Sequence, residues 1–341
     1  MAVIFMDGFD HYVSEDGPKR WTSFGSAGSH LTGALYARAP SGQGLYMKSD
    51  ANVPYKSFGS NYAGAGVLGF AFYTPVGQSF VNRQICAVLD GTTEQCSVRT
   101  NGSSVLTVTQ NGTVKATGST VLQAGTWYYL EFKFTVHGSA GVAQVKLNGA
   151  AEIASTTSLD LTGTANNYWN GVRLATDASG WIGYFDDVYV LDCATGSNTD
   201  FLGPVRVVAL SPAAPGATTA WTPNGGTNYG CVSEPYQDGD VSFNQSSTAN
   251  QVDTFVMQDL PASSGSVYAV QSIITARQDA GAARTIAPVL RPAAADRVGA
   301  TVALSTSYQL LTEIKDLNPE DSAAWETADV ASLEVGYKLI S

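Results

Sequence analysis

Acidic residues at two places in this chain could supply ligands for a calcium ion. Asp186 and Asp187 are adjacent within a strand-like run, and Asp7 follows the apolar run that opens the chain. Calcium takes about six to eight oxygen ligands, so Asp10 and loop carbonyls would have to contribute. The alternative is that one of these carboxylates accepts N–H bonds from the backbone of a neighbouring loop. The sequence leaves both roles open and indicates no other cofactor.

Residues that could catalyse a reaction are present, but they do not form a recognised arrangement. His11, His30 and His137 are the only histidines, and no G-x-S-x-G motif accompanies them, which argues against a Ser-His-Asp triad. Asp238 and Asp240 alternate across a predicted turn, whereas glycoside hydrolysis needs two carboxylates about 5 to 10 Å apart across a cleft. We therefore expect a protein that is not an enzyme, in which His137 caps the end of a strand.

Aromatic side chains beside Asn and Asp could stack on sugar rings. Trp169 is the preferred candidate for a glycan or partner contact, together with Tyr168 and Asn167, because all three lie in a loop-forming run. The alternative is that the tryptophans fill cores, since aromatic rings dominate packing energy in β-sandwiches. That role is expected of Trp127, Trp181 and Trp325. The other candidates for stacking are Trp21, Trp181 and Trp221, so both roles are open for Trp181.

Four arginines are the main concentration of positive charge in an acidic chain. They could dock an acidic surface of a partner subunit, although solvated strand faces would give the same pattern. The four are Arg277, Arg284, Arg291 and Arg297.

Composition limits the class of protein. The chain has 341 residues, enough for two domains, and 44% of them are hydrophobic, which excludes a disordered chain. Its net charge is −11, so phosphate backbones would be repelled and no nucleic-acid partner is expected. No run approaches the roughly 18 apolar residues of a membrane span, and no signal peptide is visible. We expect folding in a cytoplasm.

The four cysteines do not follow a metal-binding pattern. Their spacings of 10, 97 and 38 residues fit no zinc motif. Cys86 and Cys96 could bridge a hairpin, but free thiols are the preferred interpretation because stable disulfides are not expected in a cytoplasm.

Alternation of apolar and polar residues dominates the chain and predicts an all-β fold. Residues 105–109 and 113–117 should form a hairpin, because Asn111-Gly112 suits the positive φ angles of a type I′ turn. Residues 127–136 should form a strand with Tyr128, Leu130, Phe132 and Phe134 on one face and Glu131 and Lys133 on the other. Convincing helical periodicity is limited to short turns near residues 318–325 and 327–333.

The predicted domain boundary follows Asp192. Residues 1–192 form the first domain, residues 193–220 a small-polar linker and a first strand, and residues 221–341 a second, smaller β-sandwich that serves assembly or docking. Ser211–Gly216 is too rich in proline for a central strand.

The first domain resembles the concanavalin A-like/laminin-G-like superfamily of jelly-roll β-sandwiches. The residues that carry the resemblance are Phe5–Tyr12, Gly125–Glu131, Leu147–Gly149 and Gly183–Asp192. In that superfamily the first and last strands pair, which would place Asp7 near Asp186 and Asp187. Its glycosidases carry an E-x-D-x-x-E pattern on one strand, and the run that begins at Glu131 departs from that pattern.

The order of the two domains resembles virion structural proteins of tailed bacteriophages. The second-domain residues that carry this resemblance are Phe201–Pro204, Ser233–Pro235, Asp238–Asp240, Asn318–Pro319 and Trp325. It implies a non-enzymatic virion protein, tail-associated as a fibre or baseplate component, with other virion proteins as partners and a homo-oligomer, trimeric by preference. The alternatives are a capsid decoration protein and a carbohydrate-binding module that recognises host surface glycan. A polysaccharide-degrading enzyme is the least favoured alternative.

Overall fold

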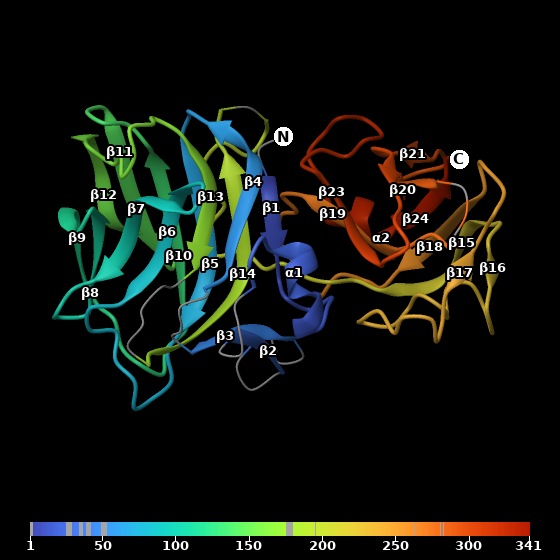
Figure 1. The fold of residues 1–341 in the computed structure, drawn as a ribbon, viewed down its shortest axis with the longest axis horizontal. Helices are drawn as coiled ribbons and strands as arrows, with labels where there is room; N and C mark the ends of the chain where they lie inside the picture. Colours follow the sequence, from blue (N-terminus) through green and yellow to red (C-terminus); the bar gives the residue numbers. More distant parts are fainter. Residues whose placement is uncertain are drawn as a thin grey trace. The chain divides into compact units, whose positions relative to one another are not determined.

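The computed structural model describes residues 3–24, 29–33, 37–38, 42–48, 53–174, 180–194, 196–262, 264–279, 281 and 283–341. The chain divides into two compact units, Met1–Val207 and Val208–Ser341. In the described part, regular helix is limited to a 3-10 turn at Ser14–Asp16, α1 (Gly17–Arg20) and α2 (Thr327–Ala331). The predicted all-β class is confirmed (Figure 1). None of the helices in these ranges has the length and apolar character needed to cross a membrane.

The first unit is a sandwich of two antiparallel sheets. The eight-stranded sheet has the order β12 (Ala150–Leu159), β11 (Gly141–Leu147), β10 (Tyr128–Thr135), β5 (Gly66–Tyr73), β14 (Ile182–Asp192), β3 (Gly44–Lys48) and β2 (Ser29–Thr32), with β1 (Val3–Asp7) also paired to β14. The six-stranded sheet has the order β4 (Tyr55–Tyr62), β13 (Trp169–Leu174), β6 (Gln84–Asp90), β7 (Thr93–Thr100), β8 (Val105–Gln110) and β9 (Thr113–Val121). The first strand pairs with the last strand of the unit, as the family resemblance implied.

Side-chain alternation places the core between these sheets. On β10, Leu130, Phe132 and Phe134 are fully buried in the core and Tyr128 is nearly so, which confirms the predicted apolar face. Glu131 lies on the opposite face, as predicted, yet it is also fully buried. The outer face of the eight-stranded sheet is therefore covered at this point.

Two local predictions can be compared directly with the backbone and the thiols. Asn111 and Gly112 have φ angles of 47° and 77° and join β8 to β9, which confirms the tight turn with positive φ. Cys86 and Cys96 are both buried free thiols, which confirms the preferred interpretation of these residues.

The first unit extends past Asp192, where the sequence placed the boundary. The backbone N–H groups of Gly203 and Val207 donate to the side chains of Glu131 and Asp187. These bonds hold residues up to 207 on the first unit. The small-polar composition of residues 193–199 predicted a linker, but it could not show where the chain detaches from the sheet.

The second unit is built on a sheet in the order β15 (Pro212–Thr219), β18 (Val252–Met257), β24 (Glu334–Leu339), β20 (Thr285–Arg291) and β21 (Arg297–Val298), with β22 (Val302–Ala303) also on β20. The proline-rich strand β15 is at the edge, as its composition required. A ribbon of β19 (Val270–Ala276) and β23 (Gln309–Lys315) packs on this sheet, with Ile274 and Leu311 against Phe255, Ile286 and Tyr337. A further short pair joins β16 (Thr222–Pro223) to β17 (Asn244–Gln245).

Candidate functional site

Four aromatic side chains line up across neighbouring strands on the outer face of the eight-stranded sheet. Tyr184 of β14 lies opposite Tyr73 of β5 on one side and opposite Tyr46 of β3 on the other. Successive residues of a strand point to opposite faces, and the neighbours Phe72 and Phe185 are in the core. The three tyrosines therefore point outward.

Trp127, the residue before β10, extends this line of rings. Its ring stacks on Tyr73 with 5.3 Å between ring centroids and 29° between the planes. The centroids of Tyr73 and Tyr184 are 5.9 Å apart, and those of Tyr184 and Tyr46 are 5.3 Å apart. Trp127, Tyr73 and Tyr46 are half-buried, while Tyr184 is 5% exposed. We call Trp127, Tyr73, Tyr184 and Tyr46 the aromatic row.

A group of charged side chains adjoins the aromatic row on the same face. Asp186 lies two residues beyond Tyr184, and its Oδ2 accepts a bond from the backbone N–H of Arg38 at 2.8 Å. The Arg38 guanidinium donates to Asp187 Oδ2 at 2.8 Å and lies 4.8 Å from the ring centroid of Tyr129. Asp10 contributes a further carboxylate, whose Oδ1 accepts the backbone N–H of Gln43 at 2.6 Å.

A β-bulge brings the two adjacent aspartates to the same side. In the pairing with β5, Asp186 lies opposite Ala71 but Tyr189 lies opposite Gly69, so β14 carries an extra residue here. Asp187 has a φ angle of 53°, a left-handed conformation that Asp adopts more readily than most residues. A regular strand would point the side chains of Asp186 and Asp187 to opposite faces, whereas both contact Arg38.

Burial makes these carboxyl groups weaker acids than usual. It raises the pKa of Asp186 to about 8, and the nearby charge of Asp187 adds to this effect. Burial also raises the pKa of Asp10 to about 6 and raises the pKa of Asp187, although Arg38 and Arg206 oppose the change at Asp187. The pKa of Asp186 therefore lies above neutral pH, whereas that of Asp10 lies below it.

The predicted calcium ligands have other bonding partners. Asp7 is fully buried and accepts bonds from the Phe9 N–H, the Tyr12 hydroxyl and the Trp21 indole N–H at 2.8 to 2.9 Å. Across the described ranges there is no group of three or more His, Cys, Asp or Glu side chains that could hold a metal ion. The bonds to Asp7, Asp186 and Asp187 instead match the alternative that carboxylates accept backbone N–H groups.

The expectation that Trp169 is exposed is wrong. Its side chain is 0% exposed, its ring stacks on Tyr62 with 4.7 Å between centroids, and its indole N–H donates to the carbonyl of Gly64 at 3.2 Å. Trp169 begins strand β13 rather than lying in a loop, so alternation turns it into the core. Tyr168 is half-buried and Asn167 is exposed, with the Asn167 side chain accepting the N–H of Gly138. By contrast Trp127, expected in the core, is in the aromatic row.

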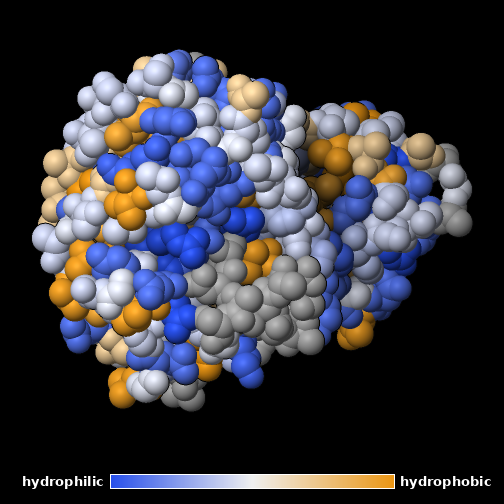
Figure 2. Space-filling model, turned by 60° about the vertical axis from the view of Figure 1, so that its left-hand side comes forward, coloured by the Kyte–Doolittle hydropathy of each residue, from blue (hydrophilic) through white to orange (hydrophobic). Residues whose placement is uncertain are grey.

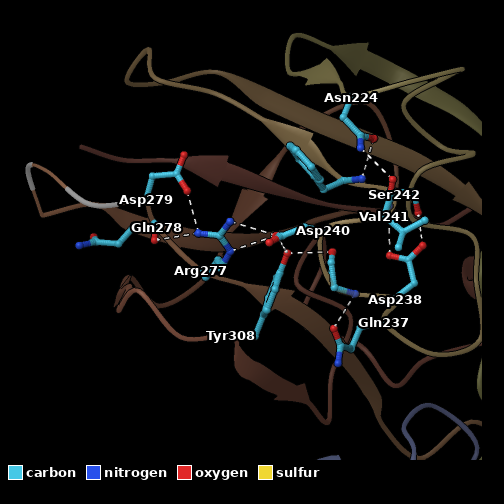
Figure 3. A network of polar contacts seen from close by, with 12 residues as sticks. Asn224, Gln237, Asp238, Asp240, Val241, Ser242, Arg277, Gln278, Asp279 and Tyr308 are labelled. Carbon is cyan, nitrogen blue, oxygen red and sulfur yellow. Dashed lines mark hydrogen bonds and ion pairs between the residues drawn. The ribbon is translucent and has the colours of Figure 1, made fainter.

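The predicted docking arginines are engaged within the second unit. Figure 3 shows Arg277 between Asp240 and Asp279, at N–O distances of 3.0 and 2.7 Å, with the Tyr308 hydroxyl also donating to Asp240. Arg291 pairs with Asp296, and Arg297 pairs with Glu320. The backbone N–H of Arg284 donates to Gln278. Carboxylates of the same unit thus offset three of the four charges, and these arginines do not form an unpaired basic patch.

The histidines do not form a catalytic group with the residues described. His137 Nδ1 accepts the backbone N–H groups of Ser139 and Ala140, which confirms its predicted capping role. His11 is a half-buried ring in edge contact with Tyr12, and its partial burial lowers its pKa to about 4. The side chain of His30 lies outside the described part.

Exposed large apolar side chains are few on the described part of the first unit. Figure 2 shows one face of the molecule, on which hydrophobic residues form small groups among hydrophilic ones. Exposed large apolar residues of the first unit in the described ranges are single valines, namely Val76, Val81, Val114 and Val121. The partly exposed aromatic row is thus a concentration of apolar ring surface on a polar unit.

The comparisons with known proteins found similarity only to solved structures. No family model matches the chain, and no curated protein matches it. The catalytic domain of the glycoside hydrolase family 131 protein from Coprinopsis cinerea is 14% identical with a TM-score of 0.40, covering 59% of this chain and 98% of that one. A conserved carbohydrate esterase from Shiga toxin-encoding bacteriophage phi24B is 14% identical with a TM-score of 0.38, covering 55% and 99%.

The binding domain of Paraclostridial Mosquitocidal Protein 1 is a third similar structure, 12% identical with a TM-score of 0.40. The match covers 56% of this chain and about half, 49%, of that domain. At such scores the three similarities do not indicate what this chain binds or does, and the proposals below depend on its own residues.

Proposed function

We propose that this protein is a non-enzymatic structural component of a tailed-phage virion, tail-associated, whose first unit binds a host-surface glycan. The observation that carries the binding role is the aromatic row. Three of its rings come from neighbouring strands and Trp127 directly precedes β10, so little conformational entropy is lost when a ligand covers them. Aromatic faces pack against the apolar C–H face of a sugar ring, and three of the four rings are partly exposed.

The charged group beside the row supplies the polar part of such a site. Sugar hydroxyls need hydrogen-bond donors and acceptors in fixed positions. The half-buried Arg38 guanidinium is held by Asp187, and the buried Asp186 carboxylate is held by the Arg38 backbone N–H. Asp10 is half-buried at the same group and has a carboxylate oxygen besides the one that Gln43 uses. This combination of ring surface and ordered polar groups is typical of a binding site for neutral or weakly polar sugars.

The virion role is supported by the resemblance of the whole chain and by its order of two all-β units. Assembly with other virion proteins and a homo-oligomer, trimeric by preference, belong to the same proposal. A place on the capsid surface is the competing virion role, because head and tail proteins use similar sandwiches.

A glycan array tests the binding role. Purified protein is applied to immobilised bacterial surface polysaccharides, alongside Trp127→Ala, Tyr73→Ala and Tyr168→Ala variants of the full chain. We expect the first two to weaken binding at least about tenfold, because a central aromatic contact is worth about 2 kcal/mol or more. Tyr168→Ala is the matched control and should bind normally. Loss of binding in Tyr168→Ala alone would move the site to the loop at residues 166–168.

Antibody labelling of purified particles tests the virion role. Gold-labelled antibody seen by negative-stain microscopy at the tail tip or fibres would support a tail-associated place. Label spread over the head would favour a decoration protein, and absence from the particle would contradict both. Shortening of glycan chains on incubation with the protein would contradict the non-enzymatic role.

A further inference from the structure

We propose that Asn111 is a site of spontaneous covalent modification, at which the Asn111-Gly112 pair converts to an Asp-Gly or an isoaspartyl-Gly pair through a cyclic imide. Asparagine is a chemically labile residue, and five Asn-Gly pairs in the chain have the atoms for this reaction. The structure singles out one of the five. The proposal is independent of glycan binding and of the virion role.

The reaction uses only the two residues of the pair and water. The backbone nitrogen of Gly112 attacks the side-chain amide carbon, Cγ, of Asn111. A C–N bond forms and the bond between Cγ and Nδ2 breaks. The proton lost by the Gly112 nitrogen ends on the leaving Nδ2, which departs as ammonia, and a five-membered imide remains. Water then adds to one of the two ring carbonyls and opens the ring to an Asp or an isoaspartyl residue. Glycine favours the attack because it has no side chain to hinder the approach.

Asn111 lies at the tip of the β8–β9 hairpin, where its side chain is not held. Asn111 and Gly112 are both exposed and lie between the paired residues Gln110 and Thr113. No hydrogen bond joins the Asn111 side chain to another residue in the described ranges. Strand β9 is at the edge of its sheet, so the tip can open without disturbing a further strand. The side chain can therefore turn its Cγ towards the Gly112 nitrogen.

The other four asparagines of these pairs have side chains that are tied by hydrogen bonds, and two of them are held through Oδ1. Asn101 Oδ1 accepts the backbone N–H groups of Ser103 and Val105 at 2.9 and 3.1 Å. Asn148 Oδ1 accepts the backbone N–H of Tyr129 at 2.8 Å. These bonds fix the side-chain rotamer, so Cγ cannot reach the nitrogen of the following glycine until they break.

The remaining two side chains are held through both atoms of the amide group. Asn170 Oδ1 accepts the N–H of Gly91 at 2.7 Å, while its Nδ2 donates to two side-chain oxygens. Asn224 Oδ1 accepts the N–H of Phe243 at 3.0 Å, and its Nδ2 donates to the carbonyl of Val241 at 2.9 Å (Figure 3). Two such bonds slow imide formation about tenfold or more, since both must break before the side chain turns.

The product differs from the original hairpin in charge and in backbone. Both products carry a carboxylate, so the tip gains a negative charge. In the isoaspartyl product the main chain runs through the side-chain carbons and is one atom longer. This no longer fits a two-residue turn with φ angles of 47° and 77° at Asn111 and Gly112. We expect the pairing of β9 with β8 to loosen from Gln110 and Thr113 onward. The aromatic row lies on the other sheet and should be unaffected.

Peptide mapping of the full chain by mass spectrometry tests the site. The protein is kept in warm, mildly alkaline buffer and sampled over weeks, and a sample taken at the start corrects for conversion during digestion. Trypsin cleaves after Arg99 and Lys115, so Asn101 and Asn111 fall in one peptide and fragmentation compares them directly. We expect Asn111 to convert at least about tenfold faster than Asn101, because two bonds hold Asn101.

Unfolded protein and two variants show whether the fold causes the difference. In denaturant the bonds of Asn101 are broken, so Asn101 and Asn111 should convert at similar rates. Asn111→Gly adopts the positive φ but has no side-chain amide, and it should lose most of the acidic form that wild type accumulates on ion exchange. Asn148→Gly is the matched control, because Asn148 also has a positive φ, of 52°, and it should accumulate the acidic form at the wild-type rate.

Four results would overturn the proposal. In the native protein, these are an Asn111 that stays unconverted and an Asn101 or Asn148 that converts as fast as Asn111. In denaturant, it is a difference between Asn101 and Asn111 as large as in the native protein, because the fold would then not be its cause. In Asn111→Gly, it is accumulation of the acidic form at the wild-type rate.

Discussion

Alanine substitutions of Trp169 and Trp127 should affect different properties: the first should lower stability, and the second should weaken glycan binding. Trp169 is fully buried and contacts the rings of Tyr62, Phe134 and Phe58 with centroids 4.7, 5.2 and 6.0 Å away. Replacing such a ring by alanine costs about 3 to 5 kcal/mol, since both burial and packing are lost. For a unit of this size each kcal/mol of lost stability lowers the thermal unfolding midpoint by about 2 to 4 °C. The midpoint of Trp169→Ala should therefore fall by about 6 to 20 °C.

Trp127→Ala should have the opposite profile. Trp127 is half-buried and its main ring contact is the stack on Tyr73, worth about 0.5 to 1.5 kcal/mol. We expect its thermal unfolding midpoint to fall by about 1 to 6 °C and its glycan binding to weaken at least about tenfold. Trp169→Phe retains a ring and leaves the Gly64 carbonyl without its indole donor, which should cost about 1 to 3 kcal/mol.

The comparison uses calorimetry of the full chain, which follows the unfolding transition of the first unit. Glycan binding is measured on the same preparations. A Trp169→Ala protein that keeps its midpoint but loses glycan binding would refute the reasoning. So would a Trp127→Ala protein that unfolds as early as Trp169→Ala and binds glycan normally when folded.

Three further outcomes can be measured on the first unit. The thiols of Cys86 and Cys96 should resist Ellman's reagent until denaturant is added, because burial raises the pKa of both; rapid labelling of the native protein would contradict this. Gly69→Ala should lower the free energy of unfolding, measured in urea, by about 1 to 3 kcal/mol, because a Cβ there would lie 2.1 Å from the buried ring of Tyr189. An unchanged urea midpoint would show that the ring can move. Because the pKa of His11 is lowered, its protonation opposes folding, and the wild type should lose stability as the pH falls from about 6.5 towards 4. His11→Phe should lose less stability over this range. Parallel pH profiles of the two proteins would contradict this.

The family resemblance and the alternation of residues predicted the arrangement of the first unit well, because both depend on local pattern. The hairpin at Asn111-Gly112 and the faces of β10 follow from turn chemistry and a period of two. The pairing of β1 with β14 followed from the resemblance. The site residues were harder to predict, because the residue pattern of one strand does not show which strand lies beside it.

Trp169 and Trp127 illustrate this limit. Asn and Tyr around Trp169 predicted a loop, but β13 begins at that residue and turns the ring inward. Trp127 is expected in the core because aromatic rings dominate packing energy, but it precedes β10 and stacks on the outer face. The aromatic row could have been suspected from tyrosines that alternate with core phenylalanines, although their alignment needed the strand order.

What the sequence by itself determined is the class of fold, the turns and the side of each strand that faces the core, since these depend on residue preferences and short periods. Only the tertiary structure decided that Tyr46, Tyr73 and Tyr184 share one row, that Asp187 sits in a bulge and that the N–H of Gly203 bonds to Glu131. These features depend on the register between strands distant in sequence and on where the chain crosses a sheet. Many registers satisfy the same alternation, and the packing of the whole unit selects one of them.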